Sequence, residues 1–518
     1  MNTDTTAAAR LQGDPTPIVV SPDDEHNRAL VEATHPPEWV NPEPAGRYNL
    51  VVIGAGTAGL VSAAGAAGLG ARVALIERHL MGGDCLNYGC VPSKALLRVA
   101  RAAHAVREAP EFGIRVNGPG STDFGAAMER LRRLRAGIAV HDSAARFAGL
   151  GIDVFLGQAA FSGPRAVEVD GRRLEFSRAV IATGARAAAP AIPGLADAGF
   201  LTNETVFSLT ALPGRLAVLG AGPIGCELAQ AFARLGSQVT LITRGTRVLP
   251  RDDEAASAVL ARQLAREGVT VVLGATIVSV CGGPGGRTLR LSGECREDIV
   301  EADEILVAVG RTPNVDGLNL VAAGVAHGPR GVEVDDRLRT SNPRIYAAGD
   351  ICSKYQFTHA ADAMARIVIQ NALFFGRRRA SALVIPWATY TDPEIAHVGL
   401  GEAGARARQT KVVTLHVGFD DVDRAVLDGE TDGFARAYVD ARSGRILGAT
   451  IVARHAGDLI GEMSLAMTTG LKIGDLSRTV HPYPTVGEAL RKLGDAWMRR
   501  RLTPRVRGLF ERYLAWMR

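Results

Sequence analysis

The chain has 518 residues, 47% of them hydrophobic and 22% charged, which is enough for three or four domains with apolar cores. Its net charge of +5 comes from the C-terminus. Residues 491–518 hold nine Lys or Arg against two acids, so the rest of the chain sums to −2, which excludes a basic nucleic-acid-binding globule. Six cysteines are too few for a disulfide scaffold. No signal-peptide pattern or membrane-spanning apolar run is present, so we expect a soluble, cytoplasmic protein.

Residues 1–46 carry seven prolines and are predicted to form an extended N-terminal arm. Within the arm, Ser21-Pro22-Asp23-Asp24 is typical of a helix start, with Ser21 as the N-cap and Pro22 at the first helical position. The helix is expected to end before Pro36-Pro37. We expect this arm to pack on the body of the protein.

The segment 47–190 begins with a dinucleotide-binding pattern. An apolar strand predicted at 48–53 leads into a glycine loop and a helix over about 57–69. Such a loop brings the free N–H groups of a helix start against a pyrophosphate, and glycines permit the close approach. Glu77, after the next strand (72–76), is placed to hold ribose hydroxyls. Long helices are predicted over 94–109 and 124–147. The glycines of this first loop are Gly54, Gly56 and Gly59.

The segment 191–312 repeats this plan, with a strand at 215–219, a second glycine loop and a helix to Leu235. Two copies of one nucleotide-binding plan imply two bound dinucleotides. After the strand 238–242, Thr243 replaces the acid, and Arg244 and Arg247 follow. Arginines offer a bidentate site for a 2′-phosphate, which favours NADPH over NADH, unless both are merely solvated. The glycines of this second loop are Gly220, Gly222 and Gly225.

The remaining chain divides into three segments. The segment 313–380 returns to the first unit through a strand leading to Asp350, and 381–493 lacks a glycine loop and is predicted to be a separate α/β domain. In the basic tail, 494–518, apolar residues from Val506 onward form a helical stripe between arginines. We favour packing of this tail within its own dimer, with an anionic membrane surface as the alternative. The predicted fold class is α/β, with two Rossmann-like dinucleotide-binding domains and a C-terminal α/β domain.

Two cysteines, Cys85 and Cys90, stand between the first glycine loop and a predicted helix. Their spacing can bring both sulfurs within bonding reach, and the helix start together with Lys94 would lower a thiol pKa. Zinc binding is the rival interpretation, but no second Cys or His pair accompanies the motif, so no metal site is predicted. A dithiol beside a dinucleotide indicates electron transfer. The other cysteines lack such partners and are expected to be reduced or buried: Cys226, Cys281, Cys295 and Cys352.

Taken together, the motifs resemble the class I pyridine nucleotide-disulfide oxidoreductases, the family of dihydrolipoamide dehydrogenase, glutathione reductase and mercuric reductase. The resemblance runs from about 48 to 493. It implies FAD in the first unit, NAD(P)H in the second and a homodimerisation domain from about 384. The motifs occur in family order: the two glycine loops, the Cys85–Cys90 pair, Ala182-Thr183-Gly184, Gly310-Arg311-Thr312-Pro313-Asn314, Ala348-Gly349-Asp350 and Thr391-Asp392-Pro393-Glu394.

The resemblance also implies roles for individual residues. Cys90 would be the thiol against the flavin and Cys85 the interchange thiol facing substrate, while Lys94 and Glu227 would form an ion pair near the flavin. Asp350 would bind the ribityl chain. The helix starting near Ala360 would direct its positive end at the flavin. Four further residues would line the cofactor sites: Ala159, Thr183, Gly184 and Gly310.

The chain departs from the family at the catalytic base. In disulfide reductases, a His-Pro pair five residues before a glutamate supplies the acid/base from the partner subunit. Here Tyr483 occupies the position of that histidine before Glu488, and His481 stands two residues early. A tyrosine is a poor base at neutral pH. Mercuric reductases resemble this chain in having Tyr there, yet they carry additional cysteine pairs near their termini that this sequence lacks. Cys352 is either an auxiliary ligand near the flavin or a buried thiol.

The sequence therefore predicts a homodimeric FAD enzyme that passes electrons from NADPH through the Cys85–Cys90 disulfide to an external acceptor, either a metal ion or a quinone. One alternative is a dihydrolipoamide dehydrogenase in which His481 recovers the role of the base. Another is a membrane-apposed flavoprotein that works through NAD(P)H-dependent interactions.

Overall fold

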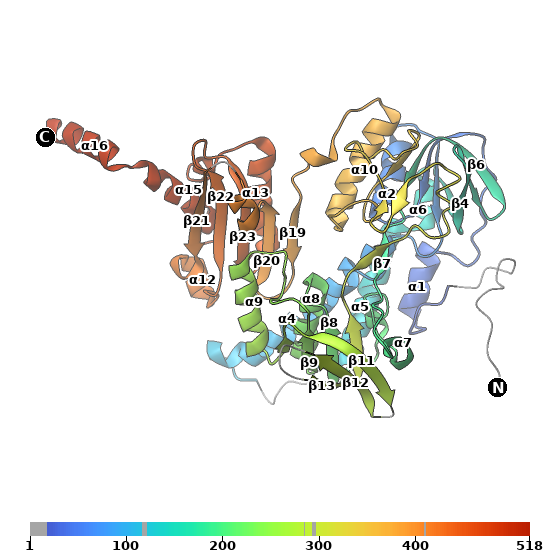
Figure 1. Ribbon diagram of the computed structural model, residues 1–518, viewed down its shortest axis with the longest axis horizontal. Helices are drawn as coiled ribbons and strands as arrows, with labels where there is room; N and C mark the ends of the chain where they lie inside the picture. The colour runs from blue at the N-terminus through green and yellow to red at the C-terminus, as the bar shows by residue number, and fades with distance from the viewer. Residues whose placement is uncertain (1–17, 117–121, 284, 293–296, 409–410) are drawn as a thin grey trace.

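The computed structural model describes residues 18–116, 122–283, 285–292, 297–408 and 411–518. Three units built on separate sheets are arranged as Figure 1 shows. The sheet of the first unit lies at the upper right, the second unit at the lower centre, and the C-terminal unit at the left. Within the described residues, no helix combines the length and apolarity that crossing a membrane requires.

The first unit is built on a parallel sheet with strand order β3-β2-β1-β6-β18. Five of the six residues of β1 are buried, as expected for a strand covered on both faces. Helices α2 and α10 pack side by side on this sheet. The strands are β1 Tyr48–Ile53, β2 Val73–Glu77, β3 Asp153–Leu156, β6 Arg172–Ile181 and β18 Ile345–Ala347, with β4 Ala159–Gly163 and β5 Ala166–Val169 as an antiparallel extension. The helices are α1 Glu25–Thr34, α2 Thr57–Gly68, α3 Gly83–Asn87, α4 Cys90–Glu108, α5 Phe124–Ala139, α6 Ala144–Gly149 and α10 Thr358–Leu373.

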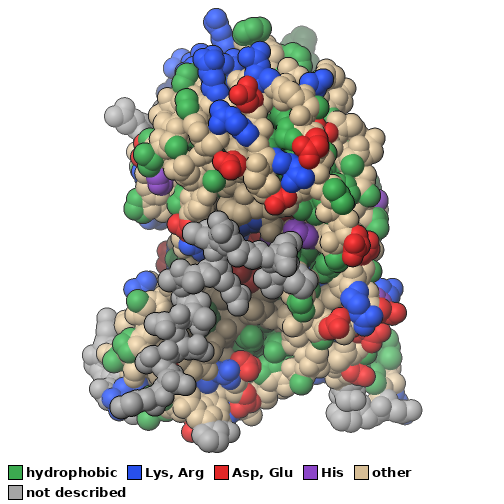
Figure 2. Space-filling view, turned by 90° about the vertical axis from the view of Figure 1, so that its right-hand side faces the viewer, with side chains coloured by type: hydrophobic (Ala, Val, Ile, Leu, Met, Phe, Trp, Pro, Cys, Tyr) green, Lys and Arg blue, Asp and Glu red, His purple; other side chains and the backbone are tan. Residues whose placement is uncertain are grey.

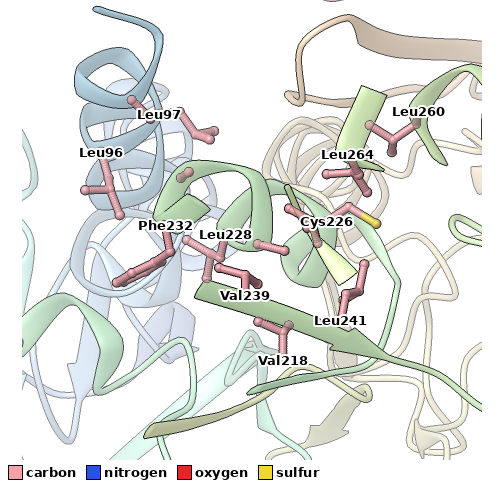
Figure 3. Close-up of a cluster of buried hydrophobic side chains, with 14 of the residues drawn as sticks. Leu96, Leu97, Val218, Cys226, Leu228, Phe232, Val239, Leu241, Leu260 and Leu264 are labelled. Atoms are coloured by element: carbon pink, nitrogen blue, oxygen red, sulfur yellow. The ribbon is translucent and has the colours of Figure 1, made fainter. Parts of the chain in front are cut away.

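The second unit repeats this topology, with strand order β10-β9-β8-β14 in a parallel sheet. Its helix α8 is buried between the sheet and α4 of the first unit. Figure 3 shows Leu228 and Phe232 of α8 between Leu96 and Leu97 of α4 and the strand residue Val239. This shared core fixes the helix that starts at Cys90 against the helix that follows the second glycine loop. The elements are β8 Arg215–Leu219, α8 Pro223–Leu235, β9 Gln238–Ile242, α9 Glu254–Arg266, β10 Thr270–Val272, β11 Thr276–Gly283, β12 Gly286–Ser292, β13 Glu297–Ala302 and β14 Glu304–Val307.

The C-terminal unit is an antiparallel sheet of order β19-β20-β23-β22-β21 with helices packed against it. Its last helix, α16, projects away from the body and buries none of its residues (Figure 1). The strands are β19 Pro386–Thr389, β20 Glu394–Gly399, β21 Val412–Gly418, β22 Phe434–Asp440 and β23 Ile446–Ala453. The helices are α11 Glu402–Arg406, α12 Asp423–Asp428, α13 Ala456–Thr469, α14 Ile473–Leu476, α15 Glu488–Arg501 and α16 Pro504–Trp516. Short elements elsewhere are β7 Ala185–Ala187, α7 Leu195–Ala198, β15 Arg311–Pro313, β16 His327–Gly328 and β17 Gly331–Val332.

The predicted fold class is confirmed, and two local predictions are wrong. The helix in the arm starts at Glu25, because the side chain of Asp24, rather than Ser21, accepts the N–H of Asn27 at 2.8 Å. The helix predicted over 124–147 ends at Ala139. A new helix begins after Ser143, whose hydroxyl accepts the N–H of Arg146.

Candidate active site

The two glycine loops have the same geometry. Gly54 and Gly220 adopt φ of +100° and +105°, and a Cβ on either would lie 2.5 Å from a backbone oxygen, that of Ala182 or Ala308. A Cβ on Gly59 or Gly225 would meet the oxygen of the first loop glycine at 1.7 or 1.8 Å. Only glycine fits these positions, and the predicted duplication of the loop is therefore present in three dimensions.

The starts of α2 and α8 are open to an anion. Gly56 and Gly222 are their N-caps, with nearly identical backbone angles, and neither helix start is capped by a side chain. Free N–H groups at a helix start are the usual binding site for a pyrophosphate. Both loops therefore fit the dinucleotides that the sequence predicts.

Glu77 lies at the end of β2, beside the first loop. Its carboxylate accepts the N–H of Ala55 at 2.7 Å and the N–H of His79 at 2.9 Å. Burial raises the pKa of Glu77, while these hydrogen bonds favour its charged form. The carboxylate thus holds the loop in shape and stands at the position predicted for a ribose contact.

The second loop has arginines in different environments at the equivalent place. Arg247 donates to the carbonyl oxygens of Pro250 at 2.9 Å and Asp252 at 3.2 Å, so it braces its own loop. Arg244 is exposed, and its side chain makes no hydrogen bond or ion pair within the described part of the chain. Of the two arginines predicted to recognise a 2′-phosphate, Arg244 is the available one.

The dithiol segment packs directly on the first glycine loop. The N–H of Gly82 donates to the oxygen of Ala55 at 2.8 Å, and a Cβ on Gly83 would lie 2.6 Å from the Cα of Gly56. The buried amide of Asn87 donates to the oxygens of Gly83 and Met81, which fixes the turn that carries Cys85. The segment that holds the thiols is therefore seated against the dinucleotide loop.

Cys85 and Cys90 interact with each other, and their surroundings distinguish them. The hydrogen bond from Cys85 lowers the pKa of Cys90 to about 6, and Thr358 and the charge of Lys94 add to the effect. The hydroxyl of Thr358 lies 3.6 Å from the sulfur of Cys90. The hydrogen bond to Cys90 and burial raise the pKa of Cys85. In the reduced pair, Cys90 is the thiolate and Cys85 the protonated thiol.

Lys94 and Glu227 form the predicted ion pair, at 2.8 Å. Glu227 is only 5% exposed, and its other carboxylate oxygen accepts the N–H of Tyr390 at 2.8 Å. The ammonium of Lys94 lies 4.5 Å from the centre of the Tyr390 ring. Burial opposes the charge of Lys94, but Glu227 outweighs burial, so the pKa of Lys94 is raised. The cation that favours the Cys90 thiolate is thus held from two sides.

Arg311 is a central residue that the sequence prediction missed. Its guanidinium lies 3.3 Å from the carboxylate of Asp84 and 3.4 Å from that of Asp350. Burial raises the pKa of Asp350 to about 6, and the charge of Arg311 counteracts this shift. Arg311 thereby joins the segment beside Cys85 to the predicted ribityl-binding carboxylate. Its only signal in the sequence is its place after Gly310 in the matched motif.

The remaining predicted cofactor residues lie on the elements around this centre. Thr183 donates its hydroxyl to the oxygen of Asn314 at 2.8 Å, and the Asn314 amide donates to the oxygen of Thr183 at 2.9 Å. Gly184 and Gly310 have positive φ, and Ala159 and Ala360 are buried. Small side chains and glycine turns leave backbone accessible to a flat cofactor, and Thr183 lies against Gly54 of the first loop, which fits FAD there.

The C-terminal residues predicted for acid–base chemistry are bound to other groups. Tyr483 is 71% exposed, and its hydroxyl donates to Asp423 at 2.9 Å, a hydrogen bond that raises the pKa of Tyr483. His481 is paired with Glu462 at 3.2 Å, and its side chain is 9% exposed. Glu488 pairs with Arg491 at 2.8 Å.

The other cysteines have separate surroundings. Cys226 is buried, and Cys352 is half-buried with its thiol near the oxygen of Gly349 at 3.6 Å. Burial raises the pKa of Cys352 to about 12, which makes it a poor ligand thiolate at neutral pH. Cys281 is a free thiol exposed on β11, which agrees with the reduced state that the sequence predicts, and Cys295 lies outside the described residues.

Comparison with known proteins confirms the resemblance. Residues 48–365 match the model "Pyridine nucleotide-disulphide oxidoreductase", and residues 385–493 match the dimerisation domain of the same family. A mercuric reductase from Bacillus cereus is 37% identical over 86% of this chain and 70% of its own length. A dihydrolipoyl dehydrogenase from Thermus scotoductus is 35% identical over 87% of this chain and 97% of its own length.

Solved structures agree with these sequence comparisons. The HOCl-induced flavoprotein disulfide reductase RclA from Escherichia coli superposes with a TM-score of 0.78 at 29% identity, covering 86% of this chain and 99% of that one. LpdA from Mycobacterium tuberculosis gives a TM-score of 0.79 at 26% identity, covering 88% and 100%. The fold, FAD dependence and dimerisation domain of the family therefore extend to this chain.

Proposed function

Because the chain belongs to the pyridine nucleotide-disulphide oxidoreductase family, we propose that it is an NADPH-dependent flavoprotein whose Cys85–Cys90 pair delivers two electrons to a thiophilic metal ion such as Hg(II). FAD, the family's cofactor, would supply the hydride-accepting chemistry that thiols lack. The observation that carries the choice of acceptor is that the neighbours of Cys90 stabilise its thiolate, whereas His481 and Tyr483, the groups that could give a proton to a departing thiolate, are bonded to other side chains.

Proton balance separates the two classes of acceptor. Reduction of a disulfide by NADPH consumes one proton and yields two thiols, so a group must protonate the departing sulfur. Reduction of Hg(II) to Hg(0) by NADPH releases one proton, and the metal itself takes none. In the C-terminal motif, the imidazole of His481 is paired with Glu462, and the hydrogen bond to Asp423 raises the pKa of Tyr483. These contacts favour the metal ion.

The relatives support the same choice. Mercuric reductases from several bacteria share 36–37% identity with this chain. The RclA protein from E. coli has been solved as a complex with Cu(II). Two thiols in one site are soft ligands, which suit such ions. A quinone remains an acceptor to be tested beside them.

NADPH is proposed as the electron donor because of Arg244. The strand end that carries Glu77 in the first unit carries Thr243 in the second, so the ribose lacks its usual acidic partner. The exposed guanidinium of Arg244 is free to bind a 2′-phosphate in bidentate fashion.

Steady-state turnover of the flavin-loaded dimer tests this function. NADPH oxidation is measured with Hg(II), Cu(II), a quinone, lipoamide and glutathione disulfide. Turnover with a metal ion is expected to exceed turnover with either disulfide by about 100-fold or more, the usual contribution of a missing acid–base group. Fast lipoamide turnover that His481→Ala abolishes, while Tyr483→Phe does not, would instead establish a dihydrolipoamide dehydrogenase.

A further inference from the structure

A cavity of about 380 Å³ lies in the first unit, away from both glycine loops. Its wall comes from β6, from the segment between β17 and β18, and from the end of α10. Four arginines line it together with Asn371 and an aromatic side chain, Phe375. The arginines are Arg178, Arg337, Arg339 and Arg377.

The cavity is at the opposite end of the sheet from the dinucleotide. Strands β1, β6 and β18 are parallel, and their carboxyl ends lead to Gly54, Ala182 and Asp350. The cavity is lined by Pro343, which precedes β18, and so it lies at the amino ends. Along α10, Thr358 near Cys90 marks the first end and Asn371 the second. The cavity is therefore separate from the candidate active site.

Most of the positive charge in the cavity is uncompensated. Arg339 pairs with Asp335 at 3.0 Å. Arg178 donates only to the oxygen of Ser177, and its Nε is buried without a partner. The side chains of Arg337 and Arg377 make no hydrogen bond or ion pair among the residues that the structure describes. Guanidiniums brought together without carboxylates repel one another, and an anion between them relieves that repulsion.

Further arginines extend this positive region. The pKa of Arg344 is lowered chiefly by the charge of Arg165, and also by Arg178 and Arg47. Figure 2 shows basic side chains gathered at the upper end of the molecule in that view. The chain outside its C-terminal tail has a net charge of −2, so this concentration does not reflect the average composition.

The wall of the cavity is fixed without a ligand. The side chain of Asn371 is buried, and its amide donates to the oxygens of Arg337 at 3.1 Å and Arg378 at 2.9 Å. The hydroxyl of Tyr346 donates to the oxygen of Asn371 at 3.2 Å. These bonds hold the backbones that carry the arginines, so a ligand would not have to order them.

Phe375 gives the cavity an aromatic rim. Its side chain is 91% exposed, and its backbone has a φ of +54°, in the left-handed region that phenylalanine rarely adopts. An exposed ring on a strained backbone adds nothing to the stability of the core, so another role for Phe375 is indicated. A flat ring beside unpaired guanidiniums is suited to a ligand with a base and phosphates.

We propose that this cavity binds a nucleoside polyphosphate, with its phosphates among Arg178, Arg337 and Arg377 and its base stacked on Phe375. Arginine forms bidentate hydrogen bonds with phosphate oxygens, and bases stack on aromatic rings regardless of their identity. The site would be a second nucleotide site, independent of the electron donor and of the acceptor.

Calorimetric titration of the flavin-loaded dimer, saturated with NADP⁺ to block the second glycine loop, tests the proposal. The probes are ATP, tripolyphosphate and adenosine at one ionic strength. ATP is expected to bind most tightly, tripolyphosphate about tenfold more weakly because it lacks the stacked base, and adenosine not measurably. Equal affinity for ATP and tripolyphosphate would overturn the role of the base.

Variants locate the binding. Arg337→Ala combined with Arg377→Ala should weaken both ATP and tripolyphosphate at least about tenfold, whereas Phe375→Ala should weaken ATP alone. Arg290→Ala, which removes an exposed arginine from β12, is the matched charge control. Unchanged flavin content and melting temperature show that the variants fold.

Unchanged ATP affinity in the double variant would refute the site. Tighter binding of a single-stranded oligonucleotide than of ATP, lost in the same variant, would replace it with a nucleic-acid surface.

Discussion

The dithiol and the C-terminal motif that should serve it are built very differently. Around Cys90, the thiol of Cys85, the hydroxyl of Thr358 and the cation of Lys94 all favour the thiolate. Lys94 is itself held by the buried carboxylate of Glu227. At the other region, Tyr483 is largely exposed and bonded to Asp423, and His481 is paired with Glu462.

The two regions therefore bear on different chemistry, electron transfer at the dithiol and proton transfer at the C-terminal motif. The dithiol region lowers the cost of placing negative charge on one sulfur, which is what an electron outlet or a soft metal ligand requires. In the C-terminal region the imidazole of His481 is paired with Glu462, and the hydroxyl of Tyr483 donates to Asp423, so both candidate proton-transfer groups are engaged with other side chains. The molecule is therefore better equipped to hand over electrons than to protonate a product.

Cys90 is the residue whose replacement should have the largest effect on turnover. Cys90→Ser should reduce metal-dependent NADPH oxidation by about 1,000-fold or more, because no other thiolate stands in the site. Bleaching of the flavin by NADPH under anaerobic conditions should persist, since that step does not need the thiol. Cys281→Ser, which removes an exposed cysteine on β11, is the control and should leave turnover unchanged. Full metal-dependent turnover in Cys90→Ser would show that the dithiol does not deliver electrons to the metal ion.

The stabilisation of the Cys90 thiolate by its neighbours can be measured as a lowered pKa in a pH titration. The pKa of Cys90 is lowered to about 6, so the thiolate-to-flavin charge-transfer absorbance of the reduced enzyme should be fully developed at pH 8, fall to half near pH 6 and disappear at lower pH. Lys94→Met removes a positive charge, so the midpoint should move to higher pH and turnover at pH 7 should fall about 10- to 100-fold. Lys94→Arg keeps the charge and should keep most of the absorbance. An identical midpoint in Lys94→Met would show that Lys94 does not act on the thiolate.

The electron donor is expected to bind at the second glycine loop, where its specificity can be tested. Arg244→Ala should lower kcat/KM for NADPH about tenfold and leave the value for NADH nearly unchanged, because only the 2′-phosphate contact is lost. Arg247→Ala should instead weaken both donors alike, since Arg247 braces the loop through the oxygens of Pro250 and Asp252. If Arg247→Ala alone removes the NADPH preference, the two arginines have exchanged their expected roles.

Much of this site could be predicted from sequence because its parts are local. Each glycine loop lies between its own strand and helix, and only four residues stand between the two cysteines, so short-range rules apply. The pairing of Lys94 with Glu227 was predicted only through family resemblance, as 132 residues separate them. The three-dimensional cause is the packing of α4 on α8, which no local pattern reveals.

The residues that were missed act over long distances. Arg311 bridges Asp84 and Asp350, and Tyr390 reaches back to Lys94 and Glu227 from the C-terminal unit. Neither side chain has a periodicity or spacing that announces such a role. The surroundings of His481 could not be predicted for the same reason. The sequence shows that His481 stands two residues before Tyr483, but its pairing with Glu462 depends on how α13 packs.

The smallest expected effect is at Tyr483, and it tests the other half of the comparison. Tyr483→Phe should change metal-dependent turnover less than about threefold, because an exposed hydroxyl bonded to Asp423 contributes little. Asp423→Asn, which alters the same hydrogen bond from its other end, should be equally mild. Tyr483→His restores an imidazole where disulfide reductases have one, so lipoamide turnover should rise while metal turnover stays constant. A tenfold loss of metal turnover in Tyr483→Phe would mean that the phenol contacts the metal ion, and the C-terminal motif would then belong to the electron outlet after all.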